Sequence, residues 1–349
     1  MFFLTSWGRF QRRFDSILKD LQVHEDLIDK TATAVNISEA RKHREDLEEW
    51  RKQALDQLSK DEVEQTAAQY LAVVGWLKFD ETDQLKIFDS IALEALNNPG
   101  TCDWVFKQPK ISAWMKCNQD TSFLFLLGHP GTGKSVLATQ IGTFLKSSGH
   151  SLIISHFCTY SYAASKDYDN ILRSIIVQLI RSNTDLVAHV YEELILKKKA
   201  PSSQVLEQLL RDLVGALSPV PSQTGYIHII VDGLDECDSK TQARTIKMLE
   251  RIMSTTLLSG STVCKVLLSS RVSQETTKKS RHRQTISLSD EKERIGQAIK
   301  HYVAQRLGVL RPRFFQQGIS DDDTKEVELR IVKKADGEPQ NLFTILKTD

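Results

Sequence analysis

The chain has 349 residues, of which 40% are hydrophobic and 26% are charged, and its formal net charge is +1. This composition is typical of a globular protein with room for two or three domains, and it excludes a chain kept disordered by its own charge. A charge so close to zero creates no overall field of the kind that attracts nucleic acid. We therefore predict no nucleic-acid partner.

Five cysteines are scattered along the chain without a C-x-x-C pair: Cys102, Cys117, Cys158, Cys237 and Cys264. This pattern predicts neither a zinc site nor a disulfide framework, and it fits a reducing compartment. No apolar stretch approaches the roughly 18–20 residues that span a bilayer. The N-terminal apolar run is too short for a signal peptide. We expect no transmembrane segment and a cytoplasmic location.

Residues 8 to about 95 contain almost no Gly or Pro and have apolar residues at helical spacing. Asn36 and Glu39 have the spacing of a helix N-cap and its N3 partner, and a long charged helix is predicted to follow. We predict an α-helical N-terminal domain over residues 1–96. A bundle that packs on itself is the simpler interpretation. Narrow apolar stripes on charged helices also allow protein partners or self-association through these helices.

The turn sequence Asn97-Asn98-Pro99-Gly100 marks the first domain boundary. The segment that follows is rich in aromatic residues, among them Trp104, Phe106 and Trp114. These side chains either line the base of a nucleotide or pack in the core of the next domain.

Five apolar residues, Phe123 to Leu127, run directly into the sequence GHPGTGKS, and apolar residues then recur at helical spacing. A buried strand, a glycine-rich turn and a helix in this order are the context in which GxxxxGK[ST] forms a phosphate-binding loop. Its backbone N–H groups surround the phosphates, Lys134 reaches the β- and γ-phosphates, and the Ser135 hydroxyl binds Mg²⁺. The predicted nucleotide-binding residues are Gly128, His129, Pro130, Gly131, Thr132, Gly133, Lys134, Ser135 and Val136. The predicted ligands are ATP, or alternatively GTP, and Mg²⁺.

Beyond this loop, apolar runs alternate with helical patterns. Strands are expected at residues 152–158, 226–231, 264–269 and 284–288, with helices between them. This alternation predicts an α/β fold, a P-loop NTPase with a parallel sheet covered by helices on both faces. Ligands then bind at the carboxyl ends of the strands. We place this domain at residues 97–289.

The residues after Asp290 are again helical in pattern. Arg311-Pro312 is predicted to break the first helix, and the acidic cluster Asp321 to Asp323 is predicted to start another. We expect residues 290–349 to form a short helical segment, which could be a truncated continuation of the NTPase module.

The third predicted strand ends in an acidic turn, Asp232-Gly233-Leu234-Asp235-Glu236. A carboxylate at the end of a buried strand beside a phosphate loop can hold Mg²⁺, and Asp232 has this position. Asp235 and Glu236 are candidates to orient or deprotonate the attacking water. Without the upstream Lys134 and Ser135, an ordinary acidic turn would be an equally good interpretation.

GHPGTGKS paired with IHIIVDGLDE resembles the NACHT, or STAND, class of signalling ATPases, which includes fungal and animal NOD-like receptors. The block from about Gly100 to Arg271 is similar to the nephrocystin-like N-terminal NTPase domain of filamentous fungi, and the preceding helices resemble the small domain often found before it. The resemblance implies that Arg271, at the end of KVLLSSR, is a sensor that contacts the γ-phosphate. It also implies slow hydrolysis in a nucleotide-dependent signalling switch, used in fungal non-self recognition or programmed cell death.

Members of this class usually continue into a winged helix and C-terminal repeats, and this sequence shows neither. Two other functions therefore stay open. One is a steady-state P-loop ATPase, and the other is a non-enzymatic interaction protein that keeps its nucleotide as a structural cofactor. Whether the chain is an enzyme depends on which of the three applies.

Overall fold

The computed structural model describes residues 15–23, 37–116, 122–149, 151–217, 225–259, 262–272, 283–316 and 321–335. Asn36 and Cys117 lie outside these ranges. The chain divides into two compact units, Met1–Lys78 with Ile180–Pro201, and Phe79–Leu179 with Ser202–Asp349. These units group residues 79–96 with the sheet, and the functional division into 1–96, 97–289 and 290–349 stays a prediction.

The first unit is helical. Its main element is α2 (Ile37–Leu77), a helix of 41 residues that packs on α7 (Thr184–Val190) and on the π-helical turn η4 (Tyr191–Ile195). The last turns of α2 are the most buried part, and Trp76 there donates a hydrogen bond from Nε1 to the Lys199 carbonyl at 2.6 Å. Residues 15–23 are helical as well. The predicted N-terminal helices are thus confirmed in the described residues.

The second unit is built on a five-stranded parallel sheet with the order β2-β3-β4-β1-β5. Its strands are β1 (Phe123–Leu127), β2 (Leu152–Phe157), β3 (Gly225–Asp232), β4 (Thr262–Ser270) and β5 (Gln284–Ser287). β1 lies between β4 and β5, and all five of its residues are buried. The predicted strands are confirmed, with ends that agree to within two residues.

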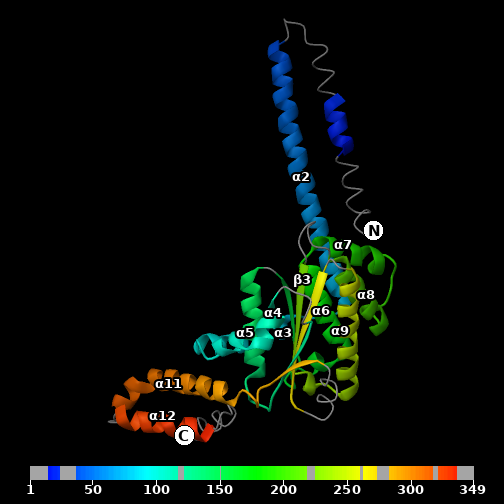
Figure 1. Ribbon diagram of the computed structural model, residues 1–349. Helices are drawn as coiled ribbons and strands as arrows, with labels where there is room; N and C mark the ends of the chain where they lie inside the picture. The colour runs from blue at the N-terminus through cyan, green and yellow to red at the C-terminus, as the bar shows by residue number, and fades with distance from the viewer. Residues whose placement is uncertain are drawn as a thin grey trace. The chain divides into compact units, whose positions relative to one another are not determined.

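Helices cover both faces of the sheet (Figure 1). One side carries α3 (Thr82–Asn97), α4 (Pro109–Met115) and α5 (Lys134–Ser148), and the other carries α6 (Tyr168–Arg181), α8 (Ser203–Ala216) and α9 (Ser239–Ser259). Alternate residues of β1 share a core with α5, because successive side chains of a strand point to opposite faces. Residues on this face include Leu124, Leu126, Leu137, Ile141, Ile230 and Leu267.

Two helices follow the sheet, α11 (Lys292–Gln316) and α12 (Asp321–Ala335). The predicted start of a helix at Asp321 is confirmed. The predicted break at Arg311-Pro312 is wrong, because α11 continues to Gln316. Proline removes one hydrogen bond and crowds the carbonyl of the preceding turn, but the earlier turns of α11 are anchored in the core through Ile295 and Val303.

The sheet and the helices that cover it therefore have the α/β fold of a P-loop NTPase, with further helices before and after them in the chain. Every helix among the described residues is too short or too polar to cross a bilayer.

Candidate nucleotide site

The glycines of the phosphate loop are required by its backbone. Gly131 and Gly133 have φ values of +71° and +84°, in the left-handed region that favours glycine. A Cβ on Gly128 would lie 2.6 Å from Thr132 Oγ1, whose hydroxyl donates to the His129 carbonyl at 2.8 Å. α5 begins directly after the loop, so its first N–H groups and its helix dipole favour a bound anion.

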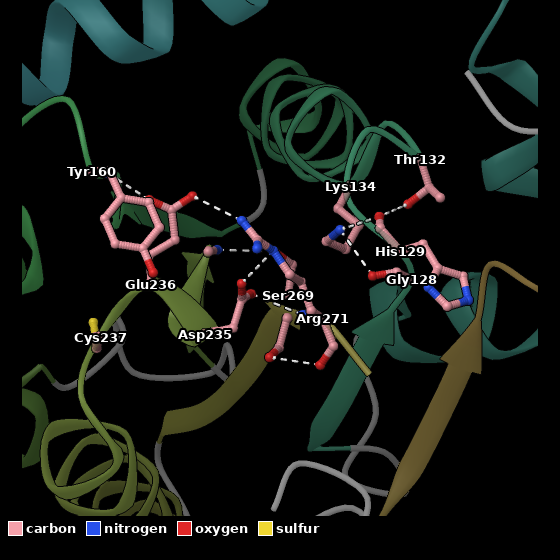
Figure 2. Close-up of polar contacts among 12 residues, drawn as sticks. Gly128, His129, Thr132, Lys134, Tyr160, Asp235, Glu236, Cys237, Ser269 and Arg271 are labelled. Atoms are coloured by element: carbon pink, nitrogen blue, oxygen red, sulfur yellow. Dashed lines mark hydrogen bonds and ion pairs between the residues drawn. The ribbon is translucent and has the colours of Figure 1, made fainter. Parts of the chain in front are cut away.

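The Lys134 ammonium folds back over this loop. Its Nζ donates to the Gly128 carbonyl at 3.0 Å and to the His129 carbonyl at 2.8 Å (Figure 2). Burial lowers the Lys134 pKa, and the carboxylates of Asp235 and Asp232 act in the opposite direction. The cation is therefore held at the mouth of the loop, within the field of the acidic turn.

Asp232 ends β3 and is almost fully buried, with 4% of its surface exposed. Burial raises its pKa, while hydrogen bonds from the Ser135 and Ser269 hydroxyls act against that shift. Ser269 also accepts the Gly233 N–H at 3.1 Å. Because β3 and β4 are parallel and pair Val231 with Leu268, the next residue of each strand lies side by side at this edge. The sequence alone predicts no role for Ser269.

These oxygen groups fit Mg²⁺. Asp232 and Ser135 share a hydrogen bond, so their oxygens are close together. Mg²⁺ commonly takes one or two protein oxygen ligands and completes its shell with phosphate and water. Within the described ranges, no three His, Cys, Asp or Glu side chains form a metal cage. Asp232 and Ser135 would thus be the protein ligands of a Mg²⁺ ion that also binds phosphate.

The turn after Asp232 closely approaches the end of β2. Gly233 has a φ of +71°, and a Cβ there would lie 2.4 Å from the Cys158 carbonyl oxygen. The Cys158 N–H in turn donates to the Asp232 carbonyl at 2.9 Å. Glycine is thus required at position 233 for both conformation and space.

The three residues predicted to be catalytic form one cluster (Figure 2). The Arg271 Nε lies 2.9 Å from Asp235 Oδ2, and its backbone N–H donates to Oδ1 at 2.8 Å. The Arg271 Nη2 is 4.0 Å from Glu236 Oε1, and the other Glu236 oxygen accepts the Tyr160 N–H. Burial raises the Glu236 pKa, against the hydrogen bond from Tyr160. Asp235 is thus placed to orient Arg271, a role that the sequence did not predict.

Most of these groups line one cavity of about 360 Å³. Its lining includes Lys134, Ser135, Asp232, Asp235, Glu236, Ser269 and Arg271, together with Pro130 and Gly131 of the loop. The structure thus brings the phosphate loop, the proposed magnesium ligand and the proposed catalytic residues together. His129 is exposed, and its backbone carbonyl accepts hydrogen bonds from the Thr132 hydroxyl and the Lys134 ammonium.

A second cavity of about 140 Å³ adjoins the loop at Gly131–Gly133, and it is mainly apolar. Trp104, Val136 and Tyr302 are among its lining residues. Trp114, by contrast, is fully buried with its ring edge against His228 at 4.9 Å between centroids. Of the aromatic residues considered for a base, Trp104 alone lines this cavity, and Phe106 packs on Phe144.

The chain has no match among curated proteins. Solved structures to which it is similar include AMPPCP-bound DnaA from Aquifex aeolicus, Cdc6p from Pyrobaculum aerophilum and the ORC2 protein of Aeropyrum pernix in ADPNP-ADP complexes. Each is 14% identical, with TM-scores of 0.32, 0.38 and 0.37. The matches cover 68%, 59% and 65% of this chain but only 58%, 50% and 55% of those chains, less than two thirds of each.

A family model described as "Nephrocystin 3, N-terminal" matches residues 100–271. These bounds agree with the block, Gly100 to Arg271, for which the sequence predicted this likeness. The matched segment contains the phosphate loop and the acidic turn, and Arg271 is its last residue. The family match and the geometry of the loop together support nucleotide binding by a P-loop NTPase domain.

Proposed function

We propose that the chain binds ATP, or alternatively GTP, with Mg²⁺ and hydrolyses it slowly as a signalling switch of the NACHT class. The observation that carries this proposal is the convergence of Lys134, Ser135, Asp232 and Arg271 on one cavity at the carboxyl edge of a parallel sheet. In the class that the sequence resembles, such a switch acts in fungal non-self recognition or programmed cell death.

The two cavities suggest how the nucleotide lies. The polar cavity offers two cations, Lys134 and Arg271, to the phosphates. The apolar cavity has a suitable lining for a purine, with Trp104 and Tyr302 as flat faces. Both cavities include Gly131, so the loop backbone is their common wall. We place the base in the apolar cavity and the triphosphate in the polar one.

Each polar side chain then has a distinct task. Ser135 and Asp232 hold Mg²⁺, which when bound neutralises phosphate charge. Glu236 is the candidate base, because burial raises its pKa toward the range in which a carboxylate accepts a proton usefully. Asp235 fixes the guanidinium of Arg271.

The contacts of Glu236 and Arg271 favour slow turnover. Arg271 is paired with Asp235, and one Glu236 oxygen is occupied by the Tyr160 N–H. Contact of Arg271 with a phosphate competes with its ion pair to Asp235, which slows turnover. Slow turnover suits a switch, whose states must persist long enough to be recognised by a partner.

The direct test is a titration with a fluorescent ATP analogue. Lys134→Ala should weaken binding by at least 100-fold, whereas Lys240→Ala, which removes an exposed lysine of α9, should bind as wild type does. Unchanged binding by Lys134→Ala would contradict the proposed site.

Turnover separates the three functions left open by the sequence. We expect hydrolysis well below roughly 1 s⁻¹ for a switch. Faster steady hydrolysis would favour an ordinary ATPase. A nucleotide that co-purifies and is never hydrolysed would favour a structural cofactor.

Protein partners or self-association through the N-terminal helices complete the proposal. α2 exposes large apolar side chains, with Trp50 55%, Val63 67% and Leu71 70% exposed. Light scattering of the full chain with ATP and with ADP would show whether assembly follows the nucleotide. Equal masses in both states would contradict a switch that acts by self-association.

A further inference from the structure

α3 lies outside the family-matched segment, yet it lines both cavities of the nucleotide site. Ile87, Ser90 and Ile91 border the polar cavity, and Ala95 and the following Asn98 border the apolar one. These positions recur at the spacing of a single helix face. The same face of α3 therefore extends along both the phosphate and the base regions.

The N-terminal end of α3 is fixed to β2 through Gln84. Its side-chain amide donates to the Phe157 carbonyl at 3.0 Å and accepts the Phe157 N–H at 2.8 Å. The Phe88 ring packs edge-on against the Phe157 ring at 6.1 Å, and the Lys146 ammonium lies 4.8 Å from the centre of the Phe88 ring. Phe157 itself lines the polar cavity, so these anchors lie beside the ligand.

A second glutamine provides a comparison. Gln178 of α6 makes the same pair of hydrogen bonds to Ser155, at 3.0 and 2.9 Å. β2 is at the edge of the sheet, so both amides satisfy backbone groups that have no neighbouring strand on that side. Gln84, however, holds α3, which lines both cavities, whereas Gln178 holds α6, none of whose residues lines either cavity.

We propose that α3 is a wall of the nucleotide site, with Ile87 and Ile91 covering the phosphates and Gln84 as the positioning residue. This inference rests on the proposed function and adds to it residues that the family match does not include. An apolar wall excludes water from the cavity, which strengthens the attraction of Lys134 and Arg271 for phosphate.

Two aspartate substitutions on the same helix test the wall. Ile91→Asp puts a carboxylate on the face that lines the cavity, and Leu93→Asp puts one on the exposed face, where Leu93 is 58% exposed. We expect Ile91→Asp to weaken binding of the fluorescent ATP analogue by at least 10-fold and Leu93→Asp to stay within two-fold of wild type. Equal affinities in the two variants would overturn the inference.

Two glutamine substitutions test the positioning role without added charge. Gln84→Leu and Gln178→Leu each remove one amide clamp from the edge of β2, so similar decreases in Tm are expected. Only Gln84→Leu should weaken nucleotide binding, by about 3- to 10-fold. If both variants bind as wild type does, Gln84 does not position the wall.

The wild-type protein and the Lys134→Ala variant are titrated with the same ATP analogue as controls. A wild type that binds no nucleotide would overturn the proposed function and this inference together. Wild-type binding that is lost in Lys134→Ala but kept in Ile91→Asp and Gln84→Leu would overturn this inference alone.

Discussion

Asp232 is a carboxylate held almost out of water at the end of β3. Burial raises the pKa of Asp232 in the folded chain, so folding favours the protonated carboxyl. The contribution of Asp232 to the free energy of unfolding therefore decreases as pH rises through the folded pKa. At neutral pH the ionised carboxylate therefore costs stability. Asp232→Asn removes that charge, and we expect the nucleotide-free protein to be more stable than wild type at neutral pH.

The same variant should lose the Mg²⁺ dependence of nucleotide binding, since an amide is a weaker ligand for a hard cation. Urea unfolding without nucleotide and an ATP-analogue titration with and without Mg²⁺ measure the two effects. A variant that is less stable than wild type at pH 8 would contradict this account of Asp232.

Gly233 and Gly149 allow backbone strain to be separated from steric clash. Their φ values, +71° and +68°, are nearly equal. A Cβ added at Gly233 would lie 2.4 Å from the Cys158 carbonyl oxygen, whereas a Cβ added at Gly149 would have no atom within 4 Å. Gly149→Ala should therefore cost about 1 kcal/mol of unfolding free energy. Gly233→Ala should cost about 3 kcal/mol or more, because strain and overpacking add. Similar urea midpoints would show that the turn can move away from Cys158.

Among the elements, the strands were predictable because burial on both faces leaves a continuous apolar run. β1 is the clearest case, with five buried apolar residues followed directly by the loop. α3 could be predicted as a helix but not as part of the site. Its anchor pairs Gln84 with Phe157, and nothing local in the sequence relates residues 73 positions apart. The proline of α11 was misread because its effect on a helix is a bias that core packing can override.

The site, too, has residues with a local sequence signal and residues whose roles depend on contacts between distant segments. Asp232 ends a strand, and Lys134 and Arg271 come after strands. Parallel strands bring their carboxyl ends to one edge, so motif and fold class together predict the proximity of these residues. Ser269 was not assigned a role because a serine before an arginine carries no signal until the register of β3 and β4 is known. The pairing of Arg271 with Asp235 depends likewise on side-chain geometry that spacing does not determine.

The N-cap of α4 is a residue type that does not by itself predict an N-cap. Gln108, rather than Ser, Thr, Asp or Asn, accepts hydrogen bonds from the Lys110 and Ile111 N–H groups at 2.6 and 3.2 Å. Gln108 also donates to Glu291 at 3.3 Å, just before α11. Gln108→Ala should lower the unfolding free energy by about 1 kcal/mol, and Gln108→Asp should recover part of it. Urea unfolding midpoints of the two variants test this prediction. Equal losses of unfolding free energy would mean that capping is not what Gln108 contributes to stability.

At the scale of the whole molecule, two buried histidines should make the fold sensitive to acid. Burial lowers the pKa of His156 to about 4 and that of His228 to about 3, from an ordinary value of 6.5. His156 contacts the Ser165 carbonyl, and His228 lies near the Lys265 ammonium, which lowers its pKa further. Both rings therefore stay neutral in the folded chain at pH values where an unfolded chain binds protons.

For a histidine with a lowered folded pKa, stability is complete above 6.5 and is lost as pH falls toward the folded pKa. At pH 5 each ring should lower the free energy of unfolding by about 2 kcal/mol relative to its value above pH 6.5. This is a large share of a total stability of about 5–15 kcal/mol. Urea unfolding between pH 7.5 and 5 measures this slope. His228→Asn should flatten it by about half, whereas His301→Asn, at an exposed position, should leave it unchanged. A wild-type midpoint that does not move over this range would contradict the prediction, because two neutral buried imidazoles require the unfolded state to gain protons first.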